Sequence, residues 1–350
     1  MSTTTATDTE TDADERIAPT SRMTKVLRRP EVGSAIAALL VFVFFTVYTS
    51  EFLSDQGVGT WLNSSSRIGI VAVAVALLMI GGEFDLSTGT MVGTSGLIVG
   101  VLTTHYGLNI FVAVVVALLA ALAIGALNGI LVMKTGLPSF IVTLGTFFAL
   151  QGVNVALTKA IIGQVAIQGM KLVPAYDSIQ PIFGGSFTLL GAPVDVSVLW
   201  FLAVIAAATW LLLRTRQGNW IFAVGGAQQS SRQVGVPVLA TKVRLFMTTA
   251  AAGWLYGMIT LFKSSTVNGA TGVGEEFIFI ICAVVGGCLL TGGFGSAIGA
   301  ALGAMIYGMT QQGIIYANWD SDWLKAFLGV MLLGAVLVNN WVRKRAELAR

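Results

Sequence analysis

The chain has 350 residues, of which 55% are hydrophobic and only 11% are charged. Because a soluble domain carries about 25% charged residues, this composition indicates a membrane protein with several spans. The formal net charge is only +3, and no basic cluster is interleaved with aromatic residues. Nucleic acid is therefore not an expected partner.

Residues 1–30 form a polar N-terminal segment. Its first half, residues 1–15, has few apolar side chains and is rich in Thr, Asp, Glu and Ala. This composition cannot offset the entropy of ordering, so we expect a disordered tail. Its basic end comes just before the first apolar run, which predicts a cytoplasmic N-terminus. The basic residues are Arg16, Arg22, Lys25, Arg28 and Arg29.

Ten apolar runs follow, each long enough to cross, as a helix, a bilayer core of about 30 Å. The sequence therefore predicts an all-α polytopic fold, with about ten transmembrane helices in a membrane domain at 31–342 and a basic cytoplasmic tail at 343–350. Fifteen of the twenty lysines and arginines then fall on the cytoplasmic side, which supports this orientation. The runs are placed at 32–50, 67–82, 88–104, 109–133, 139–158, 197–213, 243–262, 276–290, 296–316 and 323–342.

Two of these placements have alternatives. The runs at 276–290 and 296–316 share a glycine-rich junction that would equally suit a re-entrant break. In the run at 296–316, Gly299 and Gly303 form a GxxxG pair. We favour packing inside the bundle over a contact between subunits as the role of this pair.

The longest polar interruption that is rich in Arg and Lys lies at 214–242 and is predicted to be a cytoplasmic loop. Gly225 and Gly226 should end a helix or turn, and a short helix should run through Gln229, Arg232 and Val234. Gly235, Val236 and Pro237 should stop it. A helix of two turns is unstable alone in water, so we expect it to pack on the bundle or dock on a partner, with a plain connector as the alternative.

A helix break is predicted at GGEFDLSTG, residues 81–89. Glu83 and Asp85 lie at its centre, and Ser87 can cap the helix that follows. Each carboxylate would cost about 3 kcal/mol in lipid, so both must face water, protein or a cavity. A capped cytoplasmic turn and a position on a solute path are equally compatible with this pattern.

Neutral polar side chains also interrupt the apolar runs at 109–133 and 139–158. They suit a path for a hydroxylated solute, although hydrogen bonds between helices explain them as well. They are Asn128, Thr143, Thr146, Gln151 and Asn154.

Several kinds of chemistry are not expected. No G-x-x-x-x-G-K-[ST] phosphate loop occurs, and the one histidine, His105, lies in a predicted external loop. We therefore predict no catalytic residues and no metal site. Cys282 and Cys288 should lie on different faces of one apolar helix and serve in packing.

At these motifs the sequence resembles the permease subunits of ribose-type ABC importers over about residues 67–340. The family's G-G-I-D-L-S-V-G-S resembles residues 82–90, and its K-x-P-x-F-I-x-T-L-G resembles residues 137–145 preceded by Lys134. Its G-R-Y-I-Y-A-I-G-G-N-x-x-A-A-R-L-S-G-I resembles residues 218–236, and its G-G-T-S-L-x-G-G-x-G resembles residues 286–295.

The resemblance implies an importer that moves a monosaccharide or small polyol across a bacterial inner membrane. The segment 225–237 would be a coupling helix that rests on a cytoplasmic ABC ATPase, with Arg232 holding it to the ATPase or to its own loop. ATP and Mg would bind to the ATPase, so no cofactor is expected in this chain. An external solute-binding protein, a second permease copy, either identical or a paralogue, and membrane lipid would be the other partners.

The sequence departs from the family pattern at a few positions. Glu83 replaces a glycine, and Cys288 and Leu289 replace Thr and Ser. Where the family has Y-E-L-D, residues 275–278 keep the carboxylate at Glu276, another candidate for the path, but Ile278 replaces the Asp. These changes predict a less hydrated solute, such as a deoxy sugar or a polyol.

Two other functions can be weighed against an importer. A secondary transporter would need ion-coupling carboxylates, for which Glu83 and Asp85 are the candidates. A membrane enzyme would need a nucleophile and base, which the sequence does not offer.

Overall fold

The computed structural model describes residues 30–348, with side chains described up to residue 337. Helices make up most of this part. They are α2 (Pro30–Tyr48), α3 (Asp55–Ile80), α4 (Ser87–Thr104), α5 (Ile110–Thr135), α6 (Ser139–Ile162), α7 (Tyr176–Phe183), α8 (Ser197–Arg214), α9 (Arg216–Gly226), α10 (Gln228–Gln233), α11 (Val238–Ser264), α12 (Glu275–Val285), α13 (Ala297–Tyr316) and α14 (Trp323–Leu348).

The segment between α6 and α8 contains short strands and helices. Strand β1 (Ala166–Ile167) pairs antiparallel with β4 (Val267–Asn268), and β2 (Ser186–Leu189) forms a hairpin with β3 (Ala192–Asp195). Short 3-10 helices lie at Ser50–Leu53 and Met170–Leu172. Together with α7, these elements close one end of the helix bundle.

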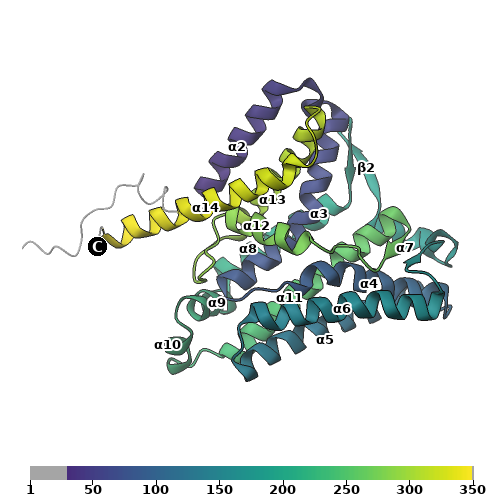
Figure 1. Ribbon diagram of the computed structural model, residues 1–350, viewed down its shortest axis with the longest axis horizontal. Coiled ribbons are helices and arrows are strands. Elements are labelled where there is room, and N and C mark those ends of the chain that lie inside the picture. The colour runs from purple at the N-terminus through teal and green to yellow at the C-terminus, as the bar shows by residue number, and fades with distance from the viewer. Residues whose placement is uncertain (1–29, 349–350) are drawn as a thin grey trace, which may run out of the picture.

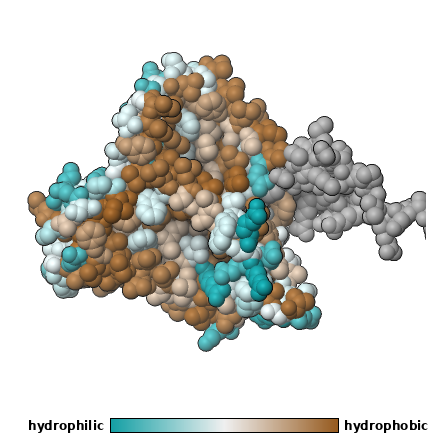
Figure 2. All heavy atoms as spheres, turned by 180° about the vertical axis from the view of Figure 1, so that it is seen from behind, coloured by the Kyte–Doolittle hydropathy of each residue, from teal (hydrophilic) through white to brown (hydrophobic). Residues whose placement is uncertain are grey.

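The molecule has two distinct ends (Figure 1). Helices α9 and α10 lie with the end of α14 on one side, and α7 lies on the other. We call these the α10 end and the α7 end. Figure 2 shows hydrophobic residues over most of the face between them, with hydrophilic residues gathered toward the ends, as expected for a bundle embedded in lipid.

Helix α3 is the buried centre of the bundle. Every residue from Ile68 to Ile80 is buried, and α8, α11, α12 and α13 pack around it. Gly69 leaves room for the ring of Phe201 on α8. The helix begins well before the run predicted at 67–82, because the polar residues 63–67 interrupt its hydropathy without interrupting the helix.

Six of the described helices are long and apolar enough to cross a membrane, namely α2, α3, α5, α6, α8 and α11. Helices α4 and α13, with 18 and 20 residues, are rich in small residues and largely buried. Helix α12 has 11 residues, or about 16 Å, roughly half a crossing. The count of ten spans stays a prediction, and the run at 276–290 forms a half-length helix followed by a turn.

Glycines bring α12 and α13 into close contact. A methyl group added at Gly299 would overlap the Gly286 carbonyl, and one added at Gly303 would overlap the Cys282 carbonyl. The GxxxG pair of α13 is therefore used inside this chain. Cys282 lies on α12, whereas Cys288 lies beyond its end. The prediction that both cysteines lie on one helix is therefore wrong, although both are buried and neither forms a disulfide.

Three breaks in helical structure meet at one point, which we call the glycine junction. It joins the end of α3, the end of α9 and the turn between α12 and α13 through Gly82, Gly225, Gly292 and Gly293. The Gly293 amide donates a hydrogen bond to the Ile80 carbonyl (2.8 Å). Gly82, Gly292 and Gly293 have φ between +75° and +82°, which disfavours other residues.

The predicted tails are only partly within the described range. Residues 1–29, including the basic residues before the first span, lie outside it. At the other end, α14 continues to Leu348, so residues 343–348 of the predicted tail are helical.

The close approach at the glycine junction predicts different effects for two adjacent substitutions. A Cβ at Gly225 would overlap the Ile80 carbonyl, whereas one at Gly226 would meet the Gly293 Cα at an ordinary 3.9 Å. Gly225→Ala should therefore destabilise the protein by about 2 kcal/mol, and Gly226→Ala should change its stability little. Thermal unfolding in detergent measures both, and equal melting temperatures would contradict the junction.

Candidate coupling surface and solute path

The coupling segment comprises residues 225–237 and connects α9 to α11. Helix α9 begins after Thr215, whose Oγ1 accepts a hydrogen bond from the Gly218 amide (3.2 Å), and it ends at Gly226. The short helix α10 forms where the sequence predicts it. Gly235 follows with φ +83°, which reverses the chain, and Pro237 precedes the first residue of α11. Local glycine and proline signals thus determine this segment.

The outer face of the coupling segment is open and chemically mixed. Val234 is 80% exposed, and Gln229, Arg232 and Pro237 are also exposed, while Val236 is half-buried. Arg232 forms no ion pair with any described residue. An exposed apolar tip beside an unpaired cation suits docking on another protein better than a plain connection.

Lys242 of α11 ties this segment to the bundle. Its ammonium pairs with the Glu83 carboxylate and donates a hydrogen bond to Gln228 Oε1 of α10 at 2.6 Å. Lys242 is 4% exposed and Glu83 9% exposed. Breaking such a buried pair by removing one partner costs about 3–5 kcal/mol. Glu83 is therefore connected to the coupling segment through Lys242.

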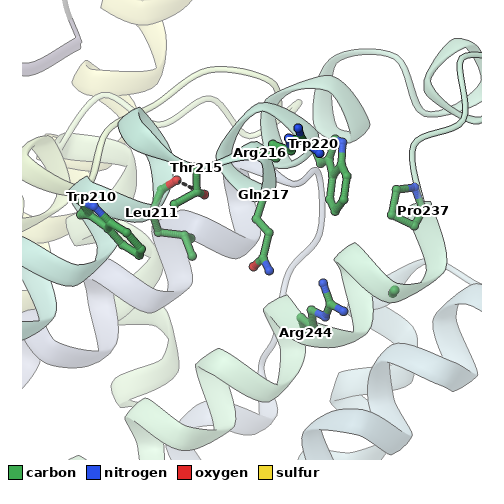
Figure 3. A pocket seen from close by; sticks show the side chains of 9 residues that line it. Trp210, Leu211, Thr215, Arg216, Gln217, Trp220, Pro237 and Arg244 are labelled. Carbon is green, nitrogen blue, oxygen red and sulfur yellow. Dashed lines mark hydrogen bonds between the residues drawn. The ribbon is translucent and has the colours of Figure 1, made fainter.

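A basic groove of about 510 Å³ adjoins the coupling segment. Figure 3 shows Trp210 at the end of α8, Gln217 and Trp220 on α9, and Arg244 on α11 around it. Arg216 and Arg244 are exposed, and no carboxylate lines the groove. The α10 end thus combines a protruding helix with a neighbouring concave, positively charged surface.

Asp85 organises the break between α3 and α4. Its carboxylate accepts hydrogen bonds from the Ser87 amide (2.9 Å), the Ser87 hydroxyl (2.6 Å) and the Thr249 hydroxyl of α11 (2.8 Å). Burial raises the pKa of the Asp85 carboxyl from its ordinary value, and these hydrogen bonds oppose the rise. Asp85, and not Ser87 as predicted, therefore supplies the oxygen that caps the start of α4.

The neutral polar candidates on α5 and α6 bind to the same break. Asn128 donates to the Ser87 hydroxyl (3.0 Å), and Thr146 donates to Asn128 Oδ1 (2.6 Å). The Thr143 hydroxyl accepts the Leu86 amide (3.1 Å). Four predicted path residues are thus linked by hydrogen bonds to one another, namely Asp85, Ser87, Asn128 and Thr146. Thr143 binds the backbone between two of them, at Leu86.

The other candidates lie apart from this network. Asn154 donates to the Thr94 hydroxyl of α4 (3.0 Å), and Gln151 is half-exposed on α6. Glu276 is buried against α4, where its Oε2 accepts the Gly274 amide (2.9 Å). The geometry of Asn154, like that of the network, is that of hydrogen bonds between helices.

Two residues that complete these contacts, Lys242 and Thr249, are not among the predicted site residues. Lys242 lies between Thr241 and Val243, directly before a predicted span and close to Arg244, so its position beside the span was the only signal for it. Nothing in the sequence marked Thr249, because a threonine is common in such a helix. Among the described residues, no group of three or more His, Cys, Asp or Glu side chains is placed to hold a metal ion.

The Asp85 network predicts a structural effect that can be separated from transport. Asp85→Ala would leave the Ser87 amide and the Thr249 hydroxyl without their acceptor, so it should lower the free energy of unfolding by about 3 kcal/mol. Asp177→Ala, at an exposed position of α7, should have little effect. Thermal unfolding in detergent checks both; unchanged stability with lost transport would instead assign Asp85 to the solute path.

Comparison with known proteins agrees with this architecture. A family model described as "Branched-chain amino acid transport system / permease component" matches residues 57–336. The inner membrane ABC transporter permease protein YjfF of Escherichia coli K12 is 29% identical over 303 residues, which are 84% of this chain and 86% of that protein.

Two further relatives are similar over nearly their whole length. The ribose import permease protein RbsC of Escherichia coli K12 is 29% identical over 313 residues, 89% of this chain and 94% of its own. The autoinducer 2 import system permease protein LsrC of Enterobacter sp. 638 is 30% identical over 326 residues, 92% of this chain and 90% of its own. No solved structure matches the chain.

The matched region runs from the start of α3 into α14 and includes the glycine junction and the coupling segment. The chain is therefore a multi-pass membrane protein without enzymatic activity of its own, and it belongs to the family of ABC transporter permeases described as the permease component of branched-chain amino acid transport systems.

Proposed function

We propose that this chain is the permease subunit of an importer that moves a monosaccharide or small polyol into the cell. A separate cytoplasmic ATPase would drive it, an external solute-binding protein would supply the solute, and two permeases would form the path. The α10 end would face the cytoplasm. ATP and Mg would be bound by the ATPase.

The coupling segment is the observation that carries this proposal. A six-residue helix is too short to be stable by itself, yet Arg232 on this helix and Val234 directly after it are both exposed. A cytoplasmic partner would cover this apolar tip and supply an acceptor for the cation. The basic groove beside it would widen the contact.

The solute class rests on the relatives. The names of RbsC and LsrC refer to ribose and autoinducer 2, whereas the family description refers to amino acids. We favour a hydroxylated solute, because the full-length relatives carry sugar or autoinducer names. ATP-dependent uptake of leucine, with none of ribose or a polyol, would contradict this choice.

A secondary transporter receives no comparable support. The two carboxylates it would use for ion coupling are engaged within the chain, Glu83 by Lys242 and Asp85 by Ser87 and Thr249. Uptake that follows an ion gradient without ATP would restore that alternative.

Charge reversal on the coupling segment tests the docking. Arg232→Glu should reduce co-purification of the ATPase and solute uptake at least tenfold, because a charge-assisted contact is replaced by repulsion. Lys134→Glu reverses an exposed charge in the last turn of α5 and should leave both unchanged. Normal ATPase binding by the Arg232 variant would refute docking at this residue.

The buried pair provides a second test of coupling. Lys242→Glu should place two carboxylates together and lower both stability and uptake strongly. Adding Glu83→Lys restores opposite charges and should recover much of the stability. Thermal unfolding and uptake are measured for the single and double variants. A double variant no more stable than Lys242→Glu alone would show that the pair does not hold the segment in place.

A further inference from the structure

Four polar side chains from four helices lie together inside the bundle without a role in the contacts above. They are Arg67 of α3, Tyr256 of α11, Glu275 of α12 and Tyr307 of α13. The guanidinium of Arg67 is within electrostatic range of the other three, although it forms no ion pair with Glu275. Charged groups inside a membrane bundle are costly, and they mark functional sites by default.

The packing of α3 and α11 places Arg67 and Tyr256 within about one helical turn of each other along the bundle. Near the α10 end, Gly81 lies against Leu245 of α11, which fixes a common reference level for the two antiparallel helices. Arg67 precedes Gly81 by fourteen residues, about 21 Å at a rise of 1.5 Å per residue, and Tyr256 follows Leu245 by eleven, about 16 Å. Tyr256 therefore lies about halfway, and Arg67 about two-thirds of the way, across a bilayer core about 30 Å thick, and both lie inside the membrane.

Glu275 reaches this depth because the chain before it is re-entrant. From Val267 to Gly274 the backbone is not α-helical, and it runs along a glycine stripe on α4. A methyl group would meet Val267 at Gly96, the Thr271 carbonyl at Gly93, and Glu276 at Gly89. Helix α12 thus begins inside the bundle. Non-helical backbone at this depth is tolerated only where protein buries it or where it lines an aqueous cavity.

The cluster retains unused hydrogen-bonding capacity. Tyr256 donates to Glu275 Oε1 (3.2 Å), while Glu275 Oε2 is buried and has no partner among the described residues. Arg67 Nε donates to the Asn63 carbonyl of its own helix (3.3 Å), and no described residue accepts from its terminal amino groups. The guanidinium of Arg67 and the carboxylate of Glu275 therefore lie near each other without forming a hydrogen bond.

The chemistry of these two groups selects a kind of ligand. A guanidinium only donates hydrogen bonds and a carboxylate only accepts them, whereas a hydroxyl does both. An anionic ligand would be repelled by Glu275, and a cationic one by Arg67. Neighbouring hydroxyl groups on one neutral molecule would satisfy both side chains.

We propose that Arg67 and Glu275, with Tyr256 and Tyr307, form a solute-binding site inside the membrane that takes a neutral molecule with adjacent hydroxyl groups. The site gives the importer a contact with its solute after release from the binding protein. This proposal rests on the proposed function, because the site would bind the solute that the importer transports.

Transport by the complete complex tests the site. The permease, its ATPase and its binding protein are reconstituted in vesicles, and uptake of labelled ribose, fructose and glucitol is measured together with ATP hydrolysis. Glu275→Gln and Arg67→Gln should lower uptake at least tenfold, as expected for losing a hydrogen bond to a charged group, while ATP hydrolysis stimulated by the binding protein persists. Lys263→Gln removes an ion pair with Asp195 at the α7 end and should change neither.

The outcomes separate the site from the proposed function. Unchanged uptake in the Glu275 and Arg67 variants would overturn the site, as would an equal loss of uptake, ATP hydrolysis and thermal stability, which indicates a structural role. If the unaltered complex moves none of the three solutes with ATP, the proposed function fails, and the labelling experiment below still decides whether the cluster faces water.

Labelling of an introduced cysteine does not depend on knowing the solute. Cys282 and Cys288 are 1% and 0% exposed, so the unaltered protein should react little with a charged, membrane-impermeant methanethiosulfonate. Glu275→Cys, or Arg67→Cys if the first variant does not fold, replaces a half-buried residue and should react readily. Leu119→Cys, on the exposed apolar face of α5, should not. An unreactive cysteine at both 275 and 67 would overturn the proposal.

Discussion

Backbone amides and carbonyls cannot bind water inside a bilayer, and each unpaired group there costs several kcal/mol. This constraint shapes the α10 end of the bundle, where the helical ladder stops at α3, α9 and α12. The breaks satisfy one another: the Gly293 amide binds the Ile80 carbonyl, and Gly82 and Gly225 let the chain segments approach. Because each break depends on the others, none of the three segments can shift without disturbing the rest.

The same dependence links the coupling segment to the membrane helices. Lys242 binds both Gln228 of α10 and Glu83 at the end of α3, and Asp85, two residues farther, binds Thr249 of α11. Both connections are buried, and close-packed interiors transmit displacement instead of absorbing it. A force on α10 would therefore act first on the break between α3 and α4, and from there on α5 and α6 through Asn128 and Thr146.

Local signals allowed much of this to be predicted from the sequence. Gly226, Gly235 and Pro237 fix the ends of α10 through backbone geometry alone, and hydropathy located most of the long helices. Contacts between distant residues could not be predicted in this way: Lys242 and Glu83 are separated by 159 positions. Hydropathy also underestimated the length of α3, because residues 63–67 are polar yet lie within a buried helix. It overestimated the length of the helix in the run at 276–290, because hydropathy alone cannot distinguish a full span from a half-length helix.

Burial in this bundle does not follow hydropathy. The apolar windows of α5 and α6 are only 33% and 17% buried, whereas that of α3, which is no more hydrophobic than that of α6, is 89% buried. Lipid accepts apolar side chains as well as a protein core does, so small and polar residues gain most from the interior. The glycines of α4 follow from this: they bring a non-helical segment against a helix at membrane depth. Among the ionisable groups that lie between the helices, Asp85 is satisfied by hydrogen bonds from Ser87 and Thr249, whereas Glu275 Oε2 is buried without a partner among the described residues.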